Sequence, residues 1–381
     1  MKRKKWPAIA GAVTLVVWFA SSAHAQGNPV KCAAPMAPAE ERIAGCTAVI
    51  EAETGPRTNL DWAYNLRALA YAEIRDFDRA IADFSRLAEL QPKEPRVYYN
   101  RGTTYFRKGD LDRAIADYDQ AIELDRGYGA AYLCRGDAYR AKGDLDASIL
   151  DYNEAIQLDP KYKAAFLERG QAYDAKGDLD RAIADYGEAI QLDRNFKMAY
   201  LRRGSAYRAK GVIDRAIADF DDGIRLDPKY PRAYRARGVA EFQAGSFAKS
   251  LADLDQSQEL DPQDSYTALW REIVGRRSNR PSVLAEKIAQ LDMSKWPAPV
   301  LRMFLGETAP EAVLAAADDA NPRVQKGQLC EANFFTGELA LQRGSKEEAA
   351  RLFNVVVADC PKNFIEWSAA KAELKALGIN P

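Results

Sequence analysis

The sequence predicts an all-α solenoid, in which one helical hairpin is repeated and stacked along the chain. A segment of 34 residues recurs six times without interruption between residues 61 and 264, and a fixed period of this length is typical of a stacked array. Within each copy, apolar residues at positions 4, 8, 11 and then 20, 21, 24 and 27 follow a helical spacing. A glycine between these two groups, at position 15 of five copies, fits a helix end, because glycine adopts the left-handed cap without strain.

Two columns of the repeat indicate how the helices of each hairpin pack. Position 8 is small: Ala68, Gly102, Gly136, Gly170, Gly204 and Gly238. Position 24 is large: Phe84, Tyr118, Tyr152, Tyr186, Phe220 and Leu254. A glycine inside a helix costs about 1 kcal/mol relative to alanine, so its recurrence indicates close helix contact. Small columns that face large ones let two helices interdigitate.

Two charged columns accompany the apolar ones. Position 7 is Arg67, Arg101, Arg135, Arg169, Arg203 and Arg237. Position 23 is Asp83, Asp117, Asp151, Asp185, Asp219 and Asp253. Equal numbers of opposite charges predict a ladder of ion pairs, within or between hairpins, which would set register more than net stability. A catalytic role is disfavoured, because an enzyme needs one special site and not six copies.

The period and the repeated residues resemble the tetratricopeptide repeat, a helix-turn-helix that stacks into a right-handed superhelix. The resemblance implies an all-α solenoid with helical caps. Its predicted repeats are residues 61–94, 95–128, 129–162, 163–196, 197–230 and 231–264. Repeat arrays need atypical ends that cover the exposed core, and residues 26–60 contain a suitable N-terminal capping helix, Ala39 to Glu53.

Residues 1–25 have the pattern of an export signal. A basic start is followed by an apolar run from Ala8 to Ala20 and by the small-residue cleavage site Ala23-His24-Ala25. We therefore expect a periplasmic protein of a Gram-negative bacterium, with no stable membrane anchor after cleavage. An exported protein favours disulfides, so Cys32 and Cys46 are a plausible pair.

The repeat register breaks after residue 264. Residues 265–329 are expected to be an irregular helical region that starts with a helix from Tyr266 to Arg276. Its later amphipathic pieces are Val283 to Leu291, Val300 to Leu305 and Pro310 to Ala317. A seventh repeat is predicted at 330–363 and a final helix within 364–381, from Ile365 to Leu377.

Cys330 and Cys360 would lie at neighbouring ends of the seventh hairpin, which places a disulfide within reach. This assignment leaves Cys134 as the odd thiol, either buried between repeats or exposed in a groove. The alternative for all five cysteines is that they remain reduced and merely pack.

The C-terminal half resembles the family of the bacterial cell-envelope protein NlpI. The resemblance is carried by Phe304-Leu305-Gly306, by the segment from Glu331 to Gly337, and by Asn363-Phe364-Ile365-Glu366. It implies a non-catalytic adaptor, often dimeric, that brings envelope proteases and cell-wall hydrolases together. The chain departs from that family in lacking a lipid-anchor cysteine after the signal, which leaves both the membrane tether and the same partners unassigned.

In repeats of this type, the first helices line a concave groove. The residues expected to form a partner-binding groove are Tyr99, Asn100, Phe106, Leu133, Arg140, Leu167, Asp174, Leu201, Arg202, Arg208, Arg235 and Phe242. A leucine stripe flanked by alternating charges suits an extended segment or helix of another protein. The alternative is that the leucines pack between neighbouring repeats and the charges are only solvated.

Composition limits the other function classes. The chain has 54 Lys and Arg against 55 Asp and Glu, and its one histidine is His24, within the predicted signal. This charge balance does not indicate nucleic-acid binding. We also expect no cofactor, no metal site and no catalytic residues. A glycan- or peptidoglycan-binding protein is the alternative function, with Tyr99, Phe106 and Phe242 as stacking platforms, and an enzyme is the least favoured.

Overall fold

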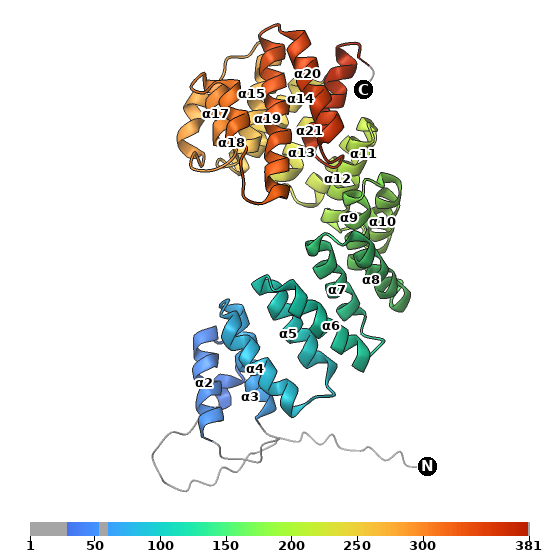
Figure 1. The fold of residues 1–381 in the computed structure, drawn as a ribbon, viewed down its shortest axis with the longest axis vertical. Coiled ribbons are helices and arrows are strands. Elements are labelled where there is room, and N and C mark those ends of the chain that lie inside the picture. The colour runs from blue at the N-terminus through green and yellow to red at the C-terminus, as the bar shows by residue number, and fades with distance from the viewer. Residues whose placement is uncertain (1–28, 53–59, 380–381) are drawn as a thin grey trace, which may run out of the picture. The chain divides into compact units, whose positions relative to one another are not determined.

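The computed structural model describes residues 29–52 and 60–379, and every regular element in these ranges is helical. The predicted export signal at 1–25, with His24, lies outside the described residues. The chain forms two compact units, one that ends at Asp110 and one that begins at Leu111. Figure 1 shows the order of the helices along each unit.

The first unit is a cap followed by the first repeated helices. Its helices are α1 Pro29–Cys32, α2 Ala39–Glu51, α3 Asp61–Glu73, α4 Phe77–Leu90 and α5 Pro95–Lys108. The predicted disulfide between Cys32 and Cys46 is present, with 4.5 Å between the Cα atoms, and it joins α1 to α2. The short helix α1 was not expected from the sequence; it positions Cys32 beside α2, where both cysteines are fully buried.

The second unit begins with helices in hairpin order, each of which packs on the next. They are α6 Leu111–Leu124, α7 Gly129–Lys142, α8 Leu145–Leu158, α9 Lys163–Ala175, α10 Leu179–Leu192, α11 Lys197–Ala209, α12 Ile213–Leu226, α13 Pro231–Gln243, α14 Phe247–Leu260 and α15 Ser265–Arg277. The first helices of consecutive hairpins, α7, α9, α11 and α13, also contact one another directly.

Glycine and aromatic residues pack closely inside each hairpin, as the small and large columns predict. A Cβ atom added to Gly170 would lie 2.6 Å from Tyr186 Cε1, and one added to Gly204 would lie 2.8 Å from Phe220 Cε1. Both aromatic rings are fully buried. Glycine therefore sets the distance between the two helices of the hairpin.

The turns follow the predicted chemistry in most hairpins. Gly143 ends α7 with a positive φ of 91°, and the Asp144 carboxylate accepts a hydrogen bond from Ala147 N at the start of α8. Ser246, also predicted as a cap, precedes α14 without a side-chain cap bond. The aspartate caps satisfy a backbone donor that the first turn of a helix leaves free.

The arginine and aspartate columns form two-point ion pairs within hairpins. Arg169 Nε lies 2.8 Å from Asp185 Oδ2 and Arg169 Nη2 lies 2.6 Å from Asp185 Oδ1. The same geometry joins Arg67 to Asp83, Arg135 to Asp151, Arg203 to Asp219, and Arg237 to Asp253. Each of these aspartates is buried.

The remaining arginine nitrogen reaches the preceding hairpin. Arg135 Nη1 donates to Asp119, Arg169 Nη1 to Asn153 and Arg237 Nη1 to Asp221, over 2.5 to 2.7 Å. Arg203 faces Gly187 at the equivalent position, which offers no side-chain acceptor. The arginine column therefore links neighbouring hairpins as well as the two helices of each hairpin.

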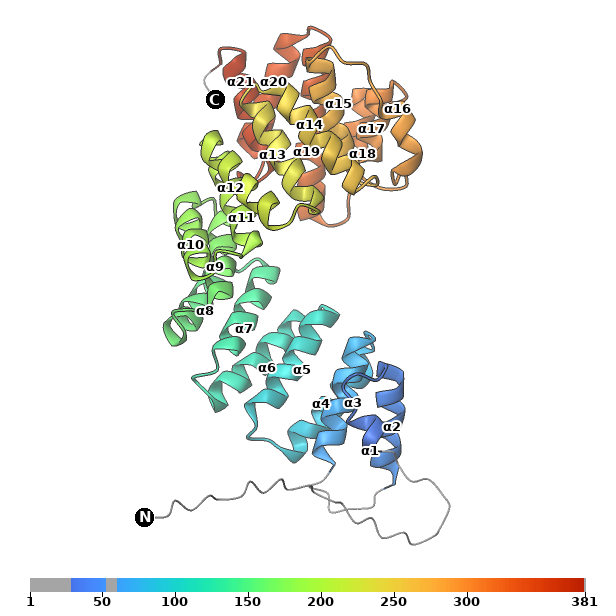
Figure 2. The ribbon, with the colours of Figure 1, turned by 180° about the vertical axis from the view of Figure 1, so that it is seen from behind.

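The C-terminal part of the second unit is a helical cluster built on α15. It contains α16 Leu284–Lys287, a 3₁₀ turn Ile288–Gln290, α17 Ala298–Leu305, α18 Pro310–Ala316, α19 Pro322–Gln342, α20 Lys346–Asp359 and α21 Ile365–Ala376. Figure 2 shows α16, α17 and α18 beside α15, on the side away from α21. Trp270, Phe334, Phe335 and Phe353 form its aromatic core.

Helix α19 differs from the sequence expectation. It begins at Pro322 rather than near Cys330, because Asn321 caps Arg323 N and Val324 N and proline is favourable at the first helical position. Cys330 consequently lies within the helix and not at its start. The predicted disulfide to Cys360 is nevertheless present, with 5.7 Å between the Cα atoms.

Candidate partner-binding site

The leucine stripe of the predicted groove is mostly covered. Leu167 and Leu201 are each 8% exposed and belong to the cores between hairpins. Leu133 is half-buried against Ile149 and Tyr152. These leucines of the inner helices thus pack between hairpins. Polar side chains form the accessible part of the inner surface.

A polar cluster connects α7, α8 and α9. Arg140 Nη2 lies 2.9 Å from Glu168 Oε2 and 3.4 Å from Asp137 Oδ1. The hydroxyl of Tyr152 donates to Asp137 Oδ1 at 2.8 Å, and Gln171 Nε2 donates to Glu168 Oε2 at 2.8 Å. The cluster holds Arg140 at a fixed place between two consecutive hairpins.

The carboxylates of this surface are partly desolvated. Burial raises the pKa of Asp137 and of Glu168, and it raises the pKa of Asp174 to about 6, against the opposing charges of Arg202 and Arg208. Asp174 Oδ1 and the hydroxyl of Tyr186 are buried and have no hydrogen-bond partner among the described residues. Exposed Arg202 stands beside them. Because these two atoms are closed to solvent, Arg202 is the group that a partner can reach at this point of the surface.

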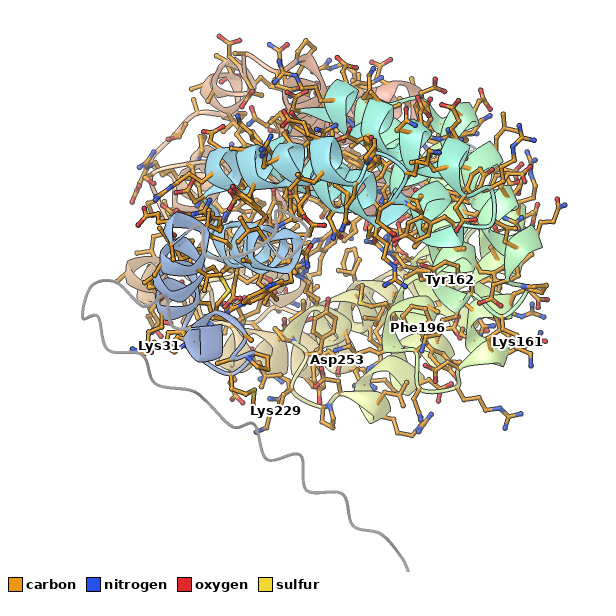
Figure 3. All side chains as sticks on the ribbon, turned by 90° about the horizontal axis from the view of Figure 1, so that it is seen from below. Lys31, Lys161, Tyr162, Phe196, Lys229 and Asp253 are labelled. Atoms are coloured by element: carbon orange, nitrogen blue, oxygen red, sulfur yellow. A yellow bond between two sulfur atoms is a disulfide. The ribbon has the colours of Figure 1, made fainter. Side chains whose placement is uncertain are left out.

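Tyr162, the residue before α9, lies near Asp137 of this cluster. Figure 3 shows Tyr162 and Phe196 on the inner side of α9 and α11, whereas Lys161 and Lys229 lie at the outer edge. The pKa of Tyr162 is raised by burial and by the nearby Cys134 and Asp137. Cys134 is half-buried and forms no disulfide.

Arg208 has a different environment from the one expected. Its side chain is 3% exposed, and Nη1 donates to the Ser368 hydroxyl at 2.5 Å and to Ile365 O at 3.4 Å. Gln243 Nε2 also donates to Ser368, at 3.1 Å. Helix α21 therefore covers this end of the inner surface, and burial lowers the pKa of Arg208 to about 10.

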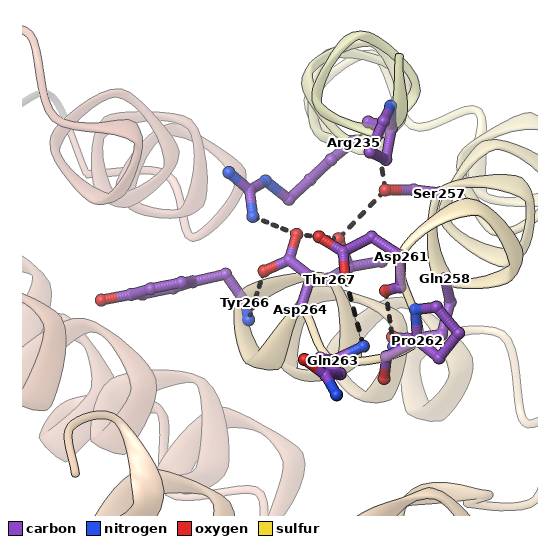
Figure 4. A network of polar contacts seen from close by, with 10 residues as sticks. Arg235, Ser257, Gln258, Asp261, Pro262, Gln263, Asp264, Tyr266 and Thr267 are labelled. Carbon is purple, nitrogen blue, oxygen red and sulfur yellow. Dashed lines mark hydrogen bonds and ion pairs between the residues drawn. The ribbon is translucent and has the colours of Figure 1, made fainter. Parts of the chain in front are cut away.

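Arg235 and Phe242 are also engaged within the second unit. Arg235 pairs with Asp264, whose second contact is the Thr267 hydroxyl (Figure 4). Phe242 is 4% exposed and lies against Phe247 and Trp270. Of the predicted groove residues in this unit, the structure brings Arg140, Asp174 and Arg202 together on the uncovered surface.

Three predicted groove residues belong to the first unit. Tyr99, Asn100 and Phe106 are half-buried on α5. The carbonyl oxygens of Tyr99 and Asn100 accept hydrogen bonds from Thr103 and Thr104 one turn later. These residues form a separate polar and aromatic face of α5.

Sequence reasoning omitted Asp137, Glu168 and Gln171 from the site. They occupy positions 6 and 9 of the repeat, which are expected to face the groove, so the repeat register could have identified them. Across residues 29–52 and 60–379, no group of His, Cys, Asp and Glu is arranged to hold a metal ion. No helix in the described part of the chain combines the length and apolar character needed to cross a membrane.

Comparisons with known proteins assign the repeats. A tetratricopeptide repeat model matches residues 65–129 and 201–265, and a TPR repeat model matches 136–177 and 170–211. Among solved structures, YrrB, described as a TPR protein with an unusual peptide-binding site, is 24% identical over 49% of this chain and 95% of its own, with a TM-score of 0.42. MamA is 25% identical over 44% and 91%, with a TM-score of 0.41. A tetratricopeptide repeat protein from Parabacteroides merdae is 17% identical over 74% and 98%, with a TM-score of 0.49.

Proposed function

This chain is a tetratricopeptide repeat protein, and we propose that it is a non-catalytic scaffold that binds an extended segment of a partner protein. The proposed contact surface is the inner face of α7, α9 and α11. Arrays of this kind use such concave surfaces for binding. The observation that carries the proposal is the exposed guanidinium of Arg202 beside the half-buried carboxylates of Glu168 and Asp174 on this face.

The surface suits a segment with both hydrogen-bond donors and acceptors. Arg140 and Arg202 present cations, while Asp137, Glu168 and Asp174 present carboxylates within the same row of helices. Such alternating charge favours one register of a bound strand and disfavours others. The carboxylates would repel a uniformly acidic partner, and the guanidinium groups would repel a uniformly basic one.

The cellular setting is part of the proposal. Two disulfides favour an oxidising compartment, and residues 1–25 have the pattern of an export signal. Together with the resemblance of the C-terminal half to NlpI-like proteins, these features support an adaptor in the bacterial cell envelope. Its partners would then be envelope proteases or cell-wall hydrolases.

Site-specific photo-crosslinking tests the contact surface. A photoreactive amino acid is placed at Arg202 on the inner face or at Leu150 on α8, which is 65% exposed. We expect a defined protein adduct from position 202 and none from position 150. Adducts only from position 150, or equal adducts from both, would contradict the inner-face assignment.

The crosslinked partner then allows an affinity test. Arg202→Glu reverses one charge at the site, whereas Arg225→Glu reverses an exposed charge on α12 as a matched control. We expect about tenfold weaker binding or more for Arg202→Glu, corresponding to about 1.4 kcal/mol, and unchanged binding for the control. Equal affinity of both variants would show that the inner face is not used.

The glycan-binding alternative is weakened by one residue. Phe242 is buried in the aromatic core, so neither of its faces is available for stacking on a sugar. Tyr99 and Phe106 on α5 are the half-buried aromatics of that alternative. Retention of the protein on purified peptidoglycan, abolished by Phe106→Ala, would favour it over the scaffold.

A further inference from the structure

A small cavity in the second unit brings together residues from four helices. It has a volume of about 250 Å³ and lies between α13, α15, α19 and the start of α21. Its lining includes Arg235, Tyr266, Trp270, Glu331, Phe364 and Glu366. Two of the sequence segments singled out above, those of Glu331 and of Glu366, therefore meet at this cavity.

Glu366 lacks a partner in the cavity. Its residue is only 5% exposed, and its carboxylate makes no ion pair or hydrogen bond with another described residue. The donor it does have is its own backbone N–H. An ionised carboxylate offers about four acceptor positions, so Glu366, which lines the cavity, can accept hydrogen bonds from a donor that enters it.

Glu331 is held in place from two sides. Trp296 Nε1 donates to Glu331 Oε2 at 2.6 Å, and the Tyr266 hydroxyl donates to the same oxygen at 3.0 Å. These two donors fix the orientation of the carboxylate without neutralising it. Burial and the charge of Glu366 raise the pKa of Glu331 to about 7.

The cations around the cavity do not balance these carboxylates. Arg235 is already paired with Asp264 (Figure 4). The positive charge of Arg208 acts to lower the pKa of Glu366, but the two side chains are not hydrogen-bonded. Arg208 donates its hydrogen bonds to the Ser368 hydroxyl and to Ile365 O. Three carboxyl groups thus share two guanidinium groups, so the cavity carries one negative charge in excess when all three are ionised.

The walls and the size indicate what would complete the site. Tyr266, Trp270 and Phe364 supply aromatic surface, which attracts cations through the ring faces. The volume is below the ~300–1,000 Å³ of pockets that hold drug-sized ligands, so the cavity fits a single side chain or a small molecule. We propose that this cavity is a socket for one primary ammonium group, either of a partner's lysine side chain or of a free alkylamine. The proposal is independent of the inner-face site.

Calorimetric titration of the full chain tests the socket. The probes are n-butylammonium and N-acetyl-lysine methylamide, with n-butanol and N-acetyl-norleucine methylamide as uncharged counterparts. We expect saturable binding of at least one ammonium compound and at least tenfold weaker binding of its uncharged counterpart. Absence of saturable binding by both ammonium probes, or equal binding of the uncharged ones, would overturn the proposal.

Variants separate the cavity from general charge effects. Glu366→Gln keeps the shape and removes the charge, and it should weaken ammonium binding at least tenfold. Glu373→Gln is the control, because Glu373 is a buried acid on the same helix that pairs with Arg277 outside the cavity. Wild-type affinity in folded Glu366→Gln would contradict the proposal; Glu331→Gln provides the same test if Glu366→Gln does not fold.

The pH dependence and the choice of probe give two further readouts. Glu331 faces Tyr266, Trp296, Glu366 and Arg235. Because its carboxyl becomes negatively charged as the pH rises through about 7, ammonium binding should strengthen between pH 6 and pH 8. Affinity that falls over this range would contradict the assigned role. Binding of the lysine compound assigns the socket to a protein partner, and binding of n-butylammonium alone assigns it to a small amine.

Discussion

At the residue scale, several arginines at position 7 bind polar side chains both within their own hairpin and in the preceding one. Spacing alone predicts that position 7 and position 23 are partners, but it does not say whether they pair within or between hairpins. The structure shows that Arg135 pairs with Asp151 in its own hairpin and with Asp119 in the preceding one. One guanidinium group has enough donors for both contacts.

Removal of one ladder aspartate should be costly. Asp185→Ala leaves Arg169 without its buried two-point partner, so we expect a loss of about 3–5 kcal/mol in the free energy of unfolding. Asp178→Ala removes a helix cap and an exposed ion pair with Arg181, and the loss of the cap should cost about 1 kcal/mol. Urea unfolding followed by circular dichroism measures both. Small and equal losses would show that the buried pair does not stabilise the hairpin.

The missing contact of Arg203 can be restored. Gly187→Asp places a carboxylate where Arg135 and Arg237 have theirs, and it also removes a glycine from the middle of α10. We expect about 1 kcal/mol from the added hydrogen bond together with a helix-propensity gain that is smaller for Asp than the ~1 kcal/mol of Gly187→Ala, so the Asp variant should be the more stable of the two. Thermal unfolding compares the two variants. A lower melting temperature for Asp than for Ala at this position would contradict the expected hydrogen bond.

The elevated pKa of Asp174 predicts a pH-dependent effect. A carboxyl whose pKa rises from 3.8 to about 6 on folding favours the folded state below pH 3.8, and this contribution is lost as the pH rises through 6. Asp174→Asn should therefore raise the melting temperature at pH 7.5 and have a smaller effect at pH 4. A benefit that is the same at both pH values would show that the group is not desolvated.

At the element scale, repeated columns predicted the hairpins well and the irregular helices less well. Helices α7 to α14 follow from the glycine and the apolar spacing that recur along the array. The early start of α19 depends on a single Asn321-Pro322 signal, which the repeat register obscured. The repeat register predicts that Arg140, Asp174 and Arg202 face the inner surface, and their part in binding stays a prediction. The docking of α21 on Arg208 could not be predicted, because it joins residues about 160 positions apart and has no counterpart in other repeats.

Two glycines inside helices should respond oppositely to alanine. Gly170→Ala forces a methyl group against Tyr186, so overpacking of about 1–3 kcal/mol should exceed the gain in helix propensity. A Cβ atom at Gly275 in α15 meets no atom within 4 Å, so Gly275→Ala should stabilise by up to about 1 kcal/mol. Chemical denaturation of both variants checks this contrast. Stabilisation by Gly170→Ala would show that the hairpin can widen without loss.

At the scale of the whole molecule, disulfides fasten the cap of the first unit and the last hairpin of the second. Non-reducing peptide mapping should show links between Cys32 and Cys46 and between Cys330 and Cys360, with Cys134 alkylated alone. Replacing both Cys330 and Cys360 by serine should cost about 3–4 kcal/mol, because the bond closes a loop of about 30 residues. A linkage that includes Cys134, or wild-type stability of the double variant, would contradict this assignment.

The contact of Arg208 with α21 also bears on how such a chain can change its length during evolution. Hairpins built from one repeated sequence are readily gained or lost by duplication and deletion of whole copies. A copy added between α7 and α10 would leave the bonds of Arg208 to Ser368 and Ile365 intact. A copy inserted between α11 and α13 would separate Arg208 from Gln243, and these two residues must reach Ser368 together. The contacts of Arg208 therefore place no limit on copy number before α11, whereas they oppose any insertion between α11 and α21.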